Sequence, residues 1–193
     1  MDIEVKGLTK SYEDKLVLDG FNAVFPEGSI TCIMGGSGCG KTTLLNIMLG
    51  FLKADAGDIA GLPEHIGVVF QEDRLCESHS AVSNVRLVTG ERYTKEEIAQ
   101  ELVNLDIAAE DVDKPVSEFS GGMKRRVAIA RAFLYECDLL VLDEAFKGLD
   151  GDTKMLVMKW AKQHADGRTI ISVTHDAQEA EFFGDRLIRM EKK

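Results

Sequence analysis

The chain has 193 residues, of which 45% are hydrophobic and 29% are charged, a balance typical of a globular protein with a substantial core. Its formal net charge of −10 argues against nucleic acid as a partner, because neutralising a phosphate backbone requires a positive face. The longest uncharged apolar stretch covers residues 42–52 and is shorter than the roughly 20 residues that a transmembrane helix needs.

The N-terminal part alternates apolar and polar side chains, which predicts two antiparallel strands over residues 2–8 and 15–25. The turn between these strands is expected at 11–14. Because the first residues are charged and alternating, we interpret them as a strand and not as a signal peptide.

The next segments predict two strands around one helix. Residues 29–34 are apolar and β-branched, which is typical of a buried strand. The apolar run at 44–50 ends in glycine, and this favours a helix that stops there. We expect a loop at 54–58 and a second buried strand at 66–70.

The pattern changes from about residue 72 to 135, where no convincing strand appears and three stretches have helical character. A capping box at 94–97 opens one helix, and its buried face is predicted to carry Ile98, Leu102 and Leu105. Ser120 is the expected N-cap of another helix, whose apolar positions are Met123, Val127, Ala130 and Leu134. We interpret this region as an all-helical lobe inserted between strands.

Strands and helices alternate again after this lobe. Strands are predicted at 139–142, 169–173 and 186–190, with helices at 152–165 and 176–183 between them. Such alternation is typical of an α/β protein with a mostly parallel sheet that is covered on both faces.

The four cysteines, at positions 32, 39, 76 and 137, have neither metal-ligand spacing nor C-x-x-C spacing. We therefore expect reduced and mostly buried thiols. No disulfide or metal site is predicted from them.

The segment between the strand at 29–34 and the helix at 44–50 fits the phosphate-loop pattern G-x-x-x-x-G-K-[ST]. Its glycines allow backbone N–H groups to surround an anion at a helix N-terminus. A glycine-rich turn without a ligand is the alternative, and the strand and helix on its flanks argue against it. The candidate nucleotide-binding residues of this phosphate loop are Gly35, Gly36, Ser37, Gly38, Cys39, Gly40, Lys41, Thr42 and Thr43.

Two side chains of this loop have a predicted task of their own. Lys41 is expected to reach the β- and γ-phosphates and to take part in catalysis, and the hydroxyl of Thr42 is expected to bind Mg²⁺. Asp143 and Glu144 follow the apolar strand at 139–142, at the edge where parallel strands present ligand sites. Asp143 is a candidate Mg²⁺ ligand, and Glu144 is a candidate base for the attacking water. A solvated turn is the alternative for Glu144.

Ser120, Gly121 and Gly122 form a further unusual element, because two glycines in the first turn of a helix cost about 1 kcal/mol each relative to alanine. An exposed helix N-terminus that meets a phosphate would compensate for this cost. The alternative is a plain junction between a loop and a helix.

Together these motifs resemble the nucleotide-binding subunits of ABC transporters over essentially the whole chain, and loosely the nitrate, sulfonate and taurine importer branch. The shared motifs, in the family's order, are the phosphate loop, Gln71, 120–122, 139–144, 148–150 and 174–176.

The resemblance implies a P-loop NTPase of α/β class, with a RecA-like, mostly parallel sheet, an antiparallel β subdomain and an inserted all-helical subdomain. Residues 1–193 would be one ABC ATPase domain. Its ATP-binding core would comprise 1–71 and 136–193, and its helical signature subdomain would comprise 72–135.

Several residue roles are implied by the resemblance alone. Tyr12 would stack on adenine, with an edge-strand tyrosine as the alternative. Gln71 would join Thr42 and Asp143 at the metal and link the attacking water to the membrane partner. His175 would hold the γ-phosphate and position the water of Glu144.

Two further roles concern a second copy of the chain. Ser120, Gly121 and Gly122 would cap the γ-phosphate of ATP bound to a head-to-tail partner, and Asp150 would communicate between the two sites. Met123 stands where many members of the family have glutamine, which alters the expected contact with the partner's nucleotide.

The function implied is that of the ATP-binding subunit of an ABC transporter, which hydrolyses ATP to ADP and phosphate with Mg²⁺. Its partners would be a second copy on ATP binding, or a similar subunit, and separate transmembrane permease subunits contacting residues 71–88. It would lie in the cytoplasm, peripheral on the inner face of the membrane. One alternative is an ABC-type ATPase with a remodelling or regulatory role, and another is a different phosphate-loop protein such as a small-molecule kinase.

Overall fold

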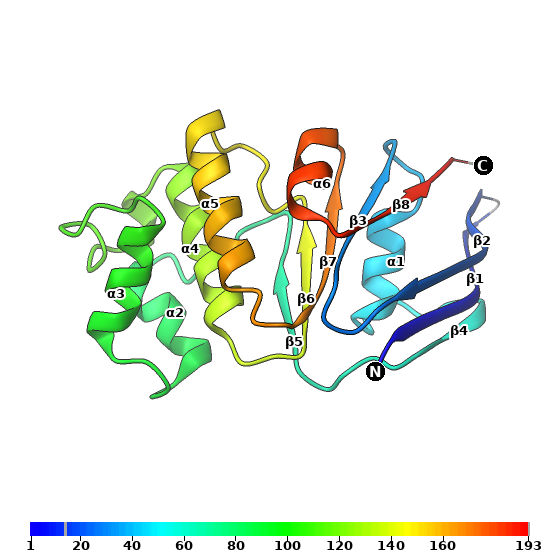
Figure 1. The fold of residues 1–193 in the computed structure, drawn as a ribbon, viewed down its shortest axis with the longest axis horizontal. Coiled ribbons are helices and arrows are strands. Elements are labelled where there is room, and N and C mark those ends of the chain that lie inside the picture. The colour runs from blue at the N-terminus through cyan, green and yellow to red at the C-terminus, as the bar shows by residue number, and fades with distance from the viewer. Residues whose placement is uncertain (14, 193) are drawn as a thin grey trace. The chain divides into compact units, whose positions relative to one another are not determined.

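A computed structural model describes residues 1–13 and 15–192 (Figure 1). The chain divides into two compact units. The first comprises Met1–Ile66, Asp138–Glu144 and Gly167–Lys193, and the second comprises Gly67–Cys137 and Ala145–Asp166. The predicted turn at 11–14 includes Asp14, which lies outside the described residues. The division into a core of 1–71 and 136–193 and a lobe of 72–135 stays a prediction.

An antiparallel sheet in the first unit has the order β2-β1-β4. Its strands are β1 (Ile3–Tyr12), β2 (Lys15–Phe25) and β4 (Ala56–Ala60). Both N-terminal strands were predicted, and β1 ends at Tyr12, beyond the alternation at 2–8. Its inner side chains Ile3, Val5 and Leu8 are almost fully buried.

The loop predicted at 54–58 is wrong for residues 56–58, because these residues lie in β4 and pair with β1. Strand β4 has an exposed to half-buried pattern and contains a glycine, so it lacks the apolar alternation of an ordinary strand. A Cβ on Gly57 would lie 2.4 Å from the carbonyl oxygen of Gly7, and its φ is +84°. The strand is therefore defined by close backbone pairing, which the side-chain pattern does not reveal.

The same unit contains a parallel sheet in which β6 (Leu139–Asp143), β7 (Thr169–Thr174), β3 (Ile30–Gly35) and β8 (Arg186–Met190) follow one another in this order. Figure 1 shows β6, β7 and β3 as neighbouring arrows. Their register pairs Val141 with Ile171 and Ile33 with Val173. The central strands are buried along their length, which explains their nearly continuous apolar sequences. The predicted parallel sheet is confirmed.

Because these strands run in the same direction, their C-terminal ends meet at one edge of the sheet. Strand β3 ends at Gly35, β6 at Asp143 and β7 at Thr174, so three motifs predicted to act on nucleotide leave the sheet there. Helices α1 (Lys41–Met48) and α6 (Ala177–Phe183) start just beyond this edge.

The second unit is mainly helical, and β5 (Ile66–Val69) crosses from the first unit into it. Its helices are α2 (Ala81–Thr89), α3 (Lys95–Asn104), the short 3₁₀ helix η1 (Val116–Glu118), α4 (Gly121–Leu134) and α5 (Gly151–Gln163). The helices predicted from the 94–97 capping box and the Ser120 N-cap are confirmed as α3 and α4. The capping box itself is present, since Thr94 N donates to Glu97 Oε2 at 2.7 Å and Glu97 N donates to Thr94 Oγ1 at 3.2 Å.

The indole ring of Trp160 on helix α5 contacts helices α3 and α4 of the same unit. The Trp160 ring meets Phe133 of α4 edge-on at a centroid distance of 5.7 Å, and its Nε1 donates to Glu101 Oε2 of α3 at 2.8 Å. The same glutamate oxygen lies 3.4 Å from Nε2 of His164, whose ring stacks on Trp160. The side chains of α3, α4 and α5 thus share one packed and hydrogen-bonded core.

Two predictions about the whole chain can be compared with the described residues. None of the helices in the described ranges is long and apolar enough to span a membrane. The cysteines remain thiols, as expected: Cys32, Cys39 and Cys137 are buried and Cys76 is exposed.

Candidate functional site

The phosphate loop begins where β3 approaches β8 too closely for a side chain. A Cβ on Gly35 would lie 2.4 Å from the carbonyl oxygen of Met190 and 2.5 Å from Sγ of Cys39. The loop ends at Gly40, which has φ +102° and acts as the N-cap of α1. Since glycine has no capping side chain, the first N–H groups of α1 can face an anion.

The side chain of Lys41 folds back onto the phosphate loop, and the residue is only 9% exposed. Its Nζ donates to the carbonyl oxygens of Gly35 at 2.6 Å and Gly36 at 3.0 Å. A lysine ammonium has three donors, and two of them are thus satisfied by the loop's own backbone. Phosphate oxygens arriving at the loop would compete for these donors.

The two threonines after Lys41 point to different surroundings. Thr42 is exposed, whereas Thr43 is buried. The hydroxyl of Thr42 at the start of α1 is therefore accessible, as a metal ligand has to be. The predicted role of Thr42 is consistent with its position.

Asp143 and Glu144 leave the sheet at the end of β6 in different ways. Asp143 is the last strand residue and is partly exposed. Glu144 has φ +50°, a conformation that costs a non-glycine residue about 1 kcal/mol or more, and its backbone N donates to the carbonyl of Val173 at 2.9 Å. This bend directs the Glu144 side chain toward the end of β7.

The Glu144 carboxylate meets His175 at that strand end. Oε1 of Glu144 lies 3.3 Å from Nδ1 of His175, with the glutamate side chain 18% exposed and the histidine side chain 60% exposed. An ion pair forms when the imidazole is protonated. The structure thus brings together the two residues predicted to act on the attacking water.

The backbone around His175 is fixed by hydrogen bonds on both sides. Thr174 Oγ1 donates to the buried Glu179 Oε2 at 2.5 Å and accepts from Asp176 N at 3.0 Å. Asp176 is the N-cap of α6. These contacts hold the loop while the imidazole stays exposed at the edge of the sheet.

His175 and the start of the phosphate loop also line one hollow of about 320 Å³. Gly35 and Gly36 form part of its wall, with Met34 of β3 and with Arg189, Met190 and Glu191 at the end of β8. The first two of the predicted phosphate-binding glycines and the predicted γ-phosphate histidine therefore line the same space.

Tyr12 ends β1 and is 45% exposed, as stacking on a flat ring requires. The preceding residues are held by Asp55, whose carboxylate accepts from Lys10 Nζ at 2.6 Å and from Ser11 N at 2.7 Å. The hydrogen bond from Lys10 has the largest effect in lowering the pKa of Asp55, and the hydrogen bond from Ser11 lowers it further. Asp55 was not predicted, because its role depends on pairing across 44 residues of sequence.

The side chains near the loop fit a magnesium ion that is bound together with nucleotide. Mg²⁺ takes oxygen ligands, uses one or two protein side chains and fills its shell with phosphate oxygens and water. Thr42 and Asp143 supply a hydroxyl and a carboxylate. Among the described residues, no group of three or more His, Cys, Asp or Glu side chains could hold a metal ion alone.

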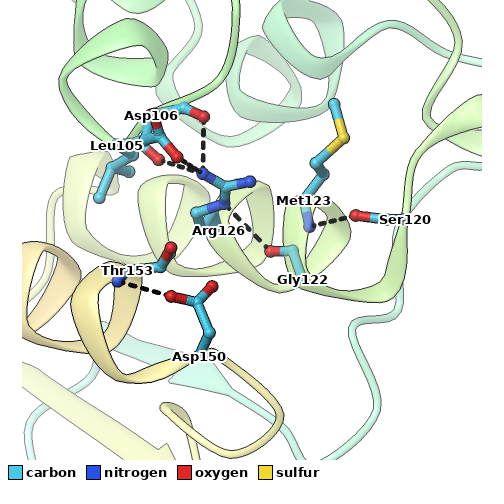
Figure 2. A network of polar contacts seen from close by, with 8 residues as sticks. All are labelled: Leu105, Asp106, Ser120, Gly122, Met123, Arg126, Asp150 and Thr153. Atoms are coloured by element: carbon cyan, nitrogen blue, oxygen red, sulfur yellow. Dashed lines mark hydrogen bonds and ion pairs between the residues drawn. The ribbon is translucent and has the colours of Figure 1, made fainter.

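In the second unit, two helix N-termini carry the remaining predicted motifs (Figure 2). Ser120 Oγ accepts from Met123 N at 3.3 Å, which confirms the predicted cap of α4, and Gly121 is exposed. Asp150 caps α5 by accepting from Thr153 N at 3.1 Å, and this backbone hydrogen bond lowers its pKa.

The start of α4 is also tied to the end of α3 by Arg126, as Figure 2 shows. Its Nη1 donates to the carbonyl oxygens of Leu105 at 3.0 Å and Asp106 at 2.6 Å, and lies 2.8 Å from Asp106 Oδ2. Its Nε donates to the carbonyl of Gly122 at 3.3 Å. A buried guanidinium thus braces the first turn of the helix that carries Ser120.

A second set of basic residues on α4 holds the segment that contains Gln71. Arg125 donates to the carbonyl oxygens of Phe70 (2.6 Å) and Gln71, and its Nε lies 3.1 Å from Asp73 Oδ1. Burial raises the pKa of Asp73, and the charge of Arg125 opposes this rise. Sequence reasoning missed these contacts. The signal that could have found them is the run of three basic residues at 124–126 in a helix that is otherwise mostly apolar.

Comparison with known proteins gives consistent matches. Residues 18–147 match the family model described as ABC transporter. The chain is 38% identical to the bicarbonate transport ATP-binding protein CmpD of Synechococcus elongatus, over 96% of this chain and 74% of that protein. It is 34% identical to the aliphatic sulfonates import ATP-binding protein SsuB 1 of Rhodococcus jostii, over 96% of this chain and 78% of that protein.

Two solved structures share the fold. A dimeric structure of a bacterial ABC transporter cassette has a TM-score of 0.85 and 30% identity, covering 98% of this chain and 94% of the cassette. A dimeric post-hydrolysis state of an ATP-binding cassette, bound to ADP and Pi, has a TM-score of 0.84 and 29% identity, covering 99% and 96%. These likenesses confirm the predicted P-loop NTPase fold.

Proposed function

The chain belongs to the ABC transporter family, and from this premise we propose how its residues perform ATP hydrolysis for transport. It is an ATPase that binds ATP with Mg²⁺. The observation that carries the proposal is the pair of Glu144 and His175 beside the hollow lined by Gly35 and Gly36. A nucleotide γ-phosphate in the loop would meet both side chains.

In the proposed reaction, the phosphate loop and Lys41 hold the β- and γ-phosphates. A water oxygen forms a bond to the γ-phosphorus while the bond from that phosphorus to the β–γ bridging oxygen breaks, and ADP leaves with the bonding electrons. Glu144 orients this water and draws off its proton, and His175 holds the γ-phosphate. Thr42, Asp143 and Gln71 would hold the Mg²⁺ ion, which would supply positive charge to offset that of the phosphates. Tyr12 stacks on the adenine.

The second half of each site is proposed to come from another chain. Ser120, Gly121 and Gly122 would cap the γ-phosphate of ATP bound to a head-to-tail partner, and Asp150 would communicate between the two sites. The exposed Gly121 and the capped N-terminus of α4 support this role, because an uncrowded helix N-terminus attracts anions. The dimeric cassettes that share this fold support the assembly.

Membrane permease subunits are the proposed partners at residues 71–88, which would place the chain at the inner face of the membrane. Helix α2 presents Leu87, 60% exposed, and Val88, 39% exposed, on this surface. The relatives named for bicarbonate transport and for aliphatic sulfonate import support the importer branch. Substrate recognition would then belong to the permease.

The partner proposal is tested by copurification of ATPase activity with membrane subunits expressed from the same cells. Leu87→Glu should abolish copurification while the free chain keeps its ATPase rate. Leu156→Glu is the matched control, because Leu156 is 39% exposed on α5, outside this surface. Failure of the wild-type chain to copurify with any membrane subunit would favour the alternative of an ABC-type ATPase with a remodelling or regulatory role.

A further inference from the structure

Arg125 lies on α4, the helix that Ser120 caps, and its side chain donates to the backbone of Gln71. Its Nη1 donates to Phe70 O at 2.6 Å, its Nη2 donates to Gln71 O, and its Nε lies 3.1 Å from a carboxylate oxygen of Asp73. The side chain is buried, with only 9% of the residue exposed. All of these residues belong to the second unit.

These contacts fix the position of Gln71 through its backbone. A guanidinium is planar and its donors have a fixed fork geometry, so two neighbouring carbonyls and one carboxylate define its orientation almost completely. The reverse also holds, because the guanidinium defines where the two carbonyls can lie. The Gln71 side chain itself is exposed, so its direction depends on this anchored backbone.

The same guanidinium is rigidly connected to the signature segment. Arg125 follows Ser120 by five residues, which corresponds to a rise of about 7.5 Å along α4. Backbone hydrogen bonds from each turn of α4 to the next make this short stretch of helix stiff. A movement of Ser120 on contact with phosphate would therefore displace the carbonyls that Arg125 holds.

We propose that Arg125 is a positioning residue that couples the signature helix to Gln71. When the N-terminus of α4 engages the phosphate of the partner's nucleotide, Arg125 carries Gln71 into place at its own site's metal and attacking water. This proposal rests on the proposed function, specifically on the roles of Gln71 and Ser120.

Arg131 provides a matched control on the same helix. It donates to the carbonyl oxygens of Asp73 at 2.9 Å and Arg74 at 2.8 Å, so it also joins α4 to this segment through two neighbouring carbonyls. It does not hold Gln71. General loosening of the segment would affect both arginine variants, whereas loss of Gln71 positioning would affect only Arg125 variants.

The experiment compares Arg125→Gln, Arg131→Gln, Gln71→Ala and the double variant Gln71→Ala/Arg125→Gln in the full chain. ATP affinity is measured by calorimetry, and kcat and the Mg²⁺ concentration for half-maximal rate by phosphate release. Arg125→Gln should lower kcat by about tenfold or more, because misplacing a reacting group by about 1 Å can cost up to a hundredfold. It should also raise the Mg²⁺ requirement and leave the ATP affinity within about twofold.

The matched variants give the decisive comparison. Arg131→Gln should keep kcat within about twofold, and the double variant should be no slower than Gln71→Ala, because both substitutions remove the same effect. Arg125→Lys keeps the charge but cannot hold two carbonyls in one plane, so its rate should fall between wild type and Arg125→Gln. It also serves as the test variant if Arg125→Gln does not fold.

Two outcomes would overturn the proposal, and they are distinguishable. If Gln71→Ala lowers kcat but Arg125→Gln lowers it further in the double variant, or if Arg131→Gln matches Arg125→Gln, Arg125 does not act through Gln71. If Gln71→Ala itself leaves kcat and the Mg²⁺ requirement unchanged, the role proposed for Gln71 fails and the coupling fails with it.

Discussion

The imidazole Nδ1 of His175 lies 3.3 Å from Oε1 of Glu144, and the two residues follow neighbouring parallel strands. Glu144 is mostly buried and is anchored through its backbone to Val173, whereas the His175 side chain is mostly exposed. The carboxylate is therefore the fixed member of the pair, and the imidazole is the member that can move to meet a phosphate.

Glu144→Gln should stop hydrolysis and trap an ATP-bound dimer, because the amide can accept a hydrogen bond from water but cannot take its proton. A loss of turnover of about 10²–10⁴-fold is expected for a general base. Sedimentation of this variant with ATP and Mg²⁺ should show a dimer, and wild type should show less of it at steady state. A variant that remains monomeric at saturating ATP contradicts the two-chain site.

His175→Ala should lower kcat by about 10²-fold with little change in ATP affinity, since the loop that holds the nucleotide is untouched. His65→Ala is a suitable control, because His65 is also exposed. It directly precedes strand β5, whereas His175 directly follows strand β7. Equal rates for the two variants would show that His175 has no part in turnover.

Lys41→Ala should abolish ATP binding or turnover, because it removes the buried ammonium that the phosphates are proposed to claim. Calorimetry with ATP and Mg²⁺ checks this directly. Thermal denaturation without nucleotide serves as the control for folding, since loss of the bonds to Gly35 and Gly36 alone should lower the midpoint only modestly.

Ser120→Arg should leave ATP binding intact and stop turnover, because Ser120 lies in the second unit and is proposed to serve a partner's nucleotide. Mixing this variant with Lys41→Ala tests the arrangement further. In a head-to-tail pair, one of the two sites would then combine an intact loop with an intact signature segment. Recovery of part of the activity on mixing is expected, and its absence would count against sharing of sites between chains.

Asp55→Asn should destabilise the first unit at neutral pH and have no such effect in acid. The pKa of Asp55 is lowered in the folded protein by its hydrogen bonds from Lys10 and Ser11. The ionised carboxylate therefore stabilises the folded state. Its stabilisation is present above the ordinary value of 3.8 and is lost as the pH falls through the lower folded-state pKa. Urea denaturation of both proteins at pH 7 and at successively lower pH measures this, and the difference between them should shrink below pH 3.8. The effect should be small and salt-sensitive, because the site is exposed.

Much of this architecture follows from local sequence patterns. The phosphate loop, the capping box at Thr94 and the apolar strands before Gly35 and Asp143 all have signals that lie within a few neighbouring residues. Strand β4 was missed because its formation depends on the backbone of β1, and four of its five residues are polar or small. The grip of Arg125 on Phe70 and Gln71 was missed for a related reason, because the partners are more than 50 residues apart and the acceptors are carbonyl groups, which every residue has.

The bonds from Lys41 to the carbonyls of Gly35 and Gly36 have a consequence for the life of the protein between catalytic cycles. Without these bonds, product release would leave the buried ammonium of Lys41 with no hydrogen-bond acceptor, which would favour local unfolding. The carbonyl oxygens of Gly35 and Gly36 accept its hydrogen bonds when no phosphate is present. The empty loop can therefore wait for its next nucleotide in a folded state, and prolonged ATP depletion should not make the chain vulnerable to proteases at this loop.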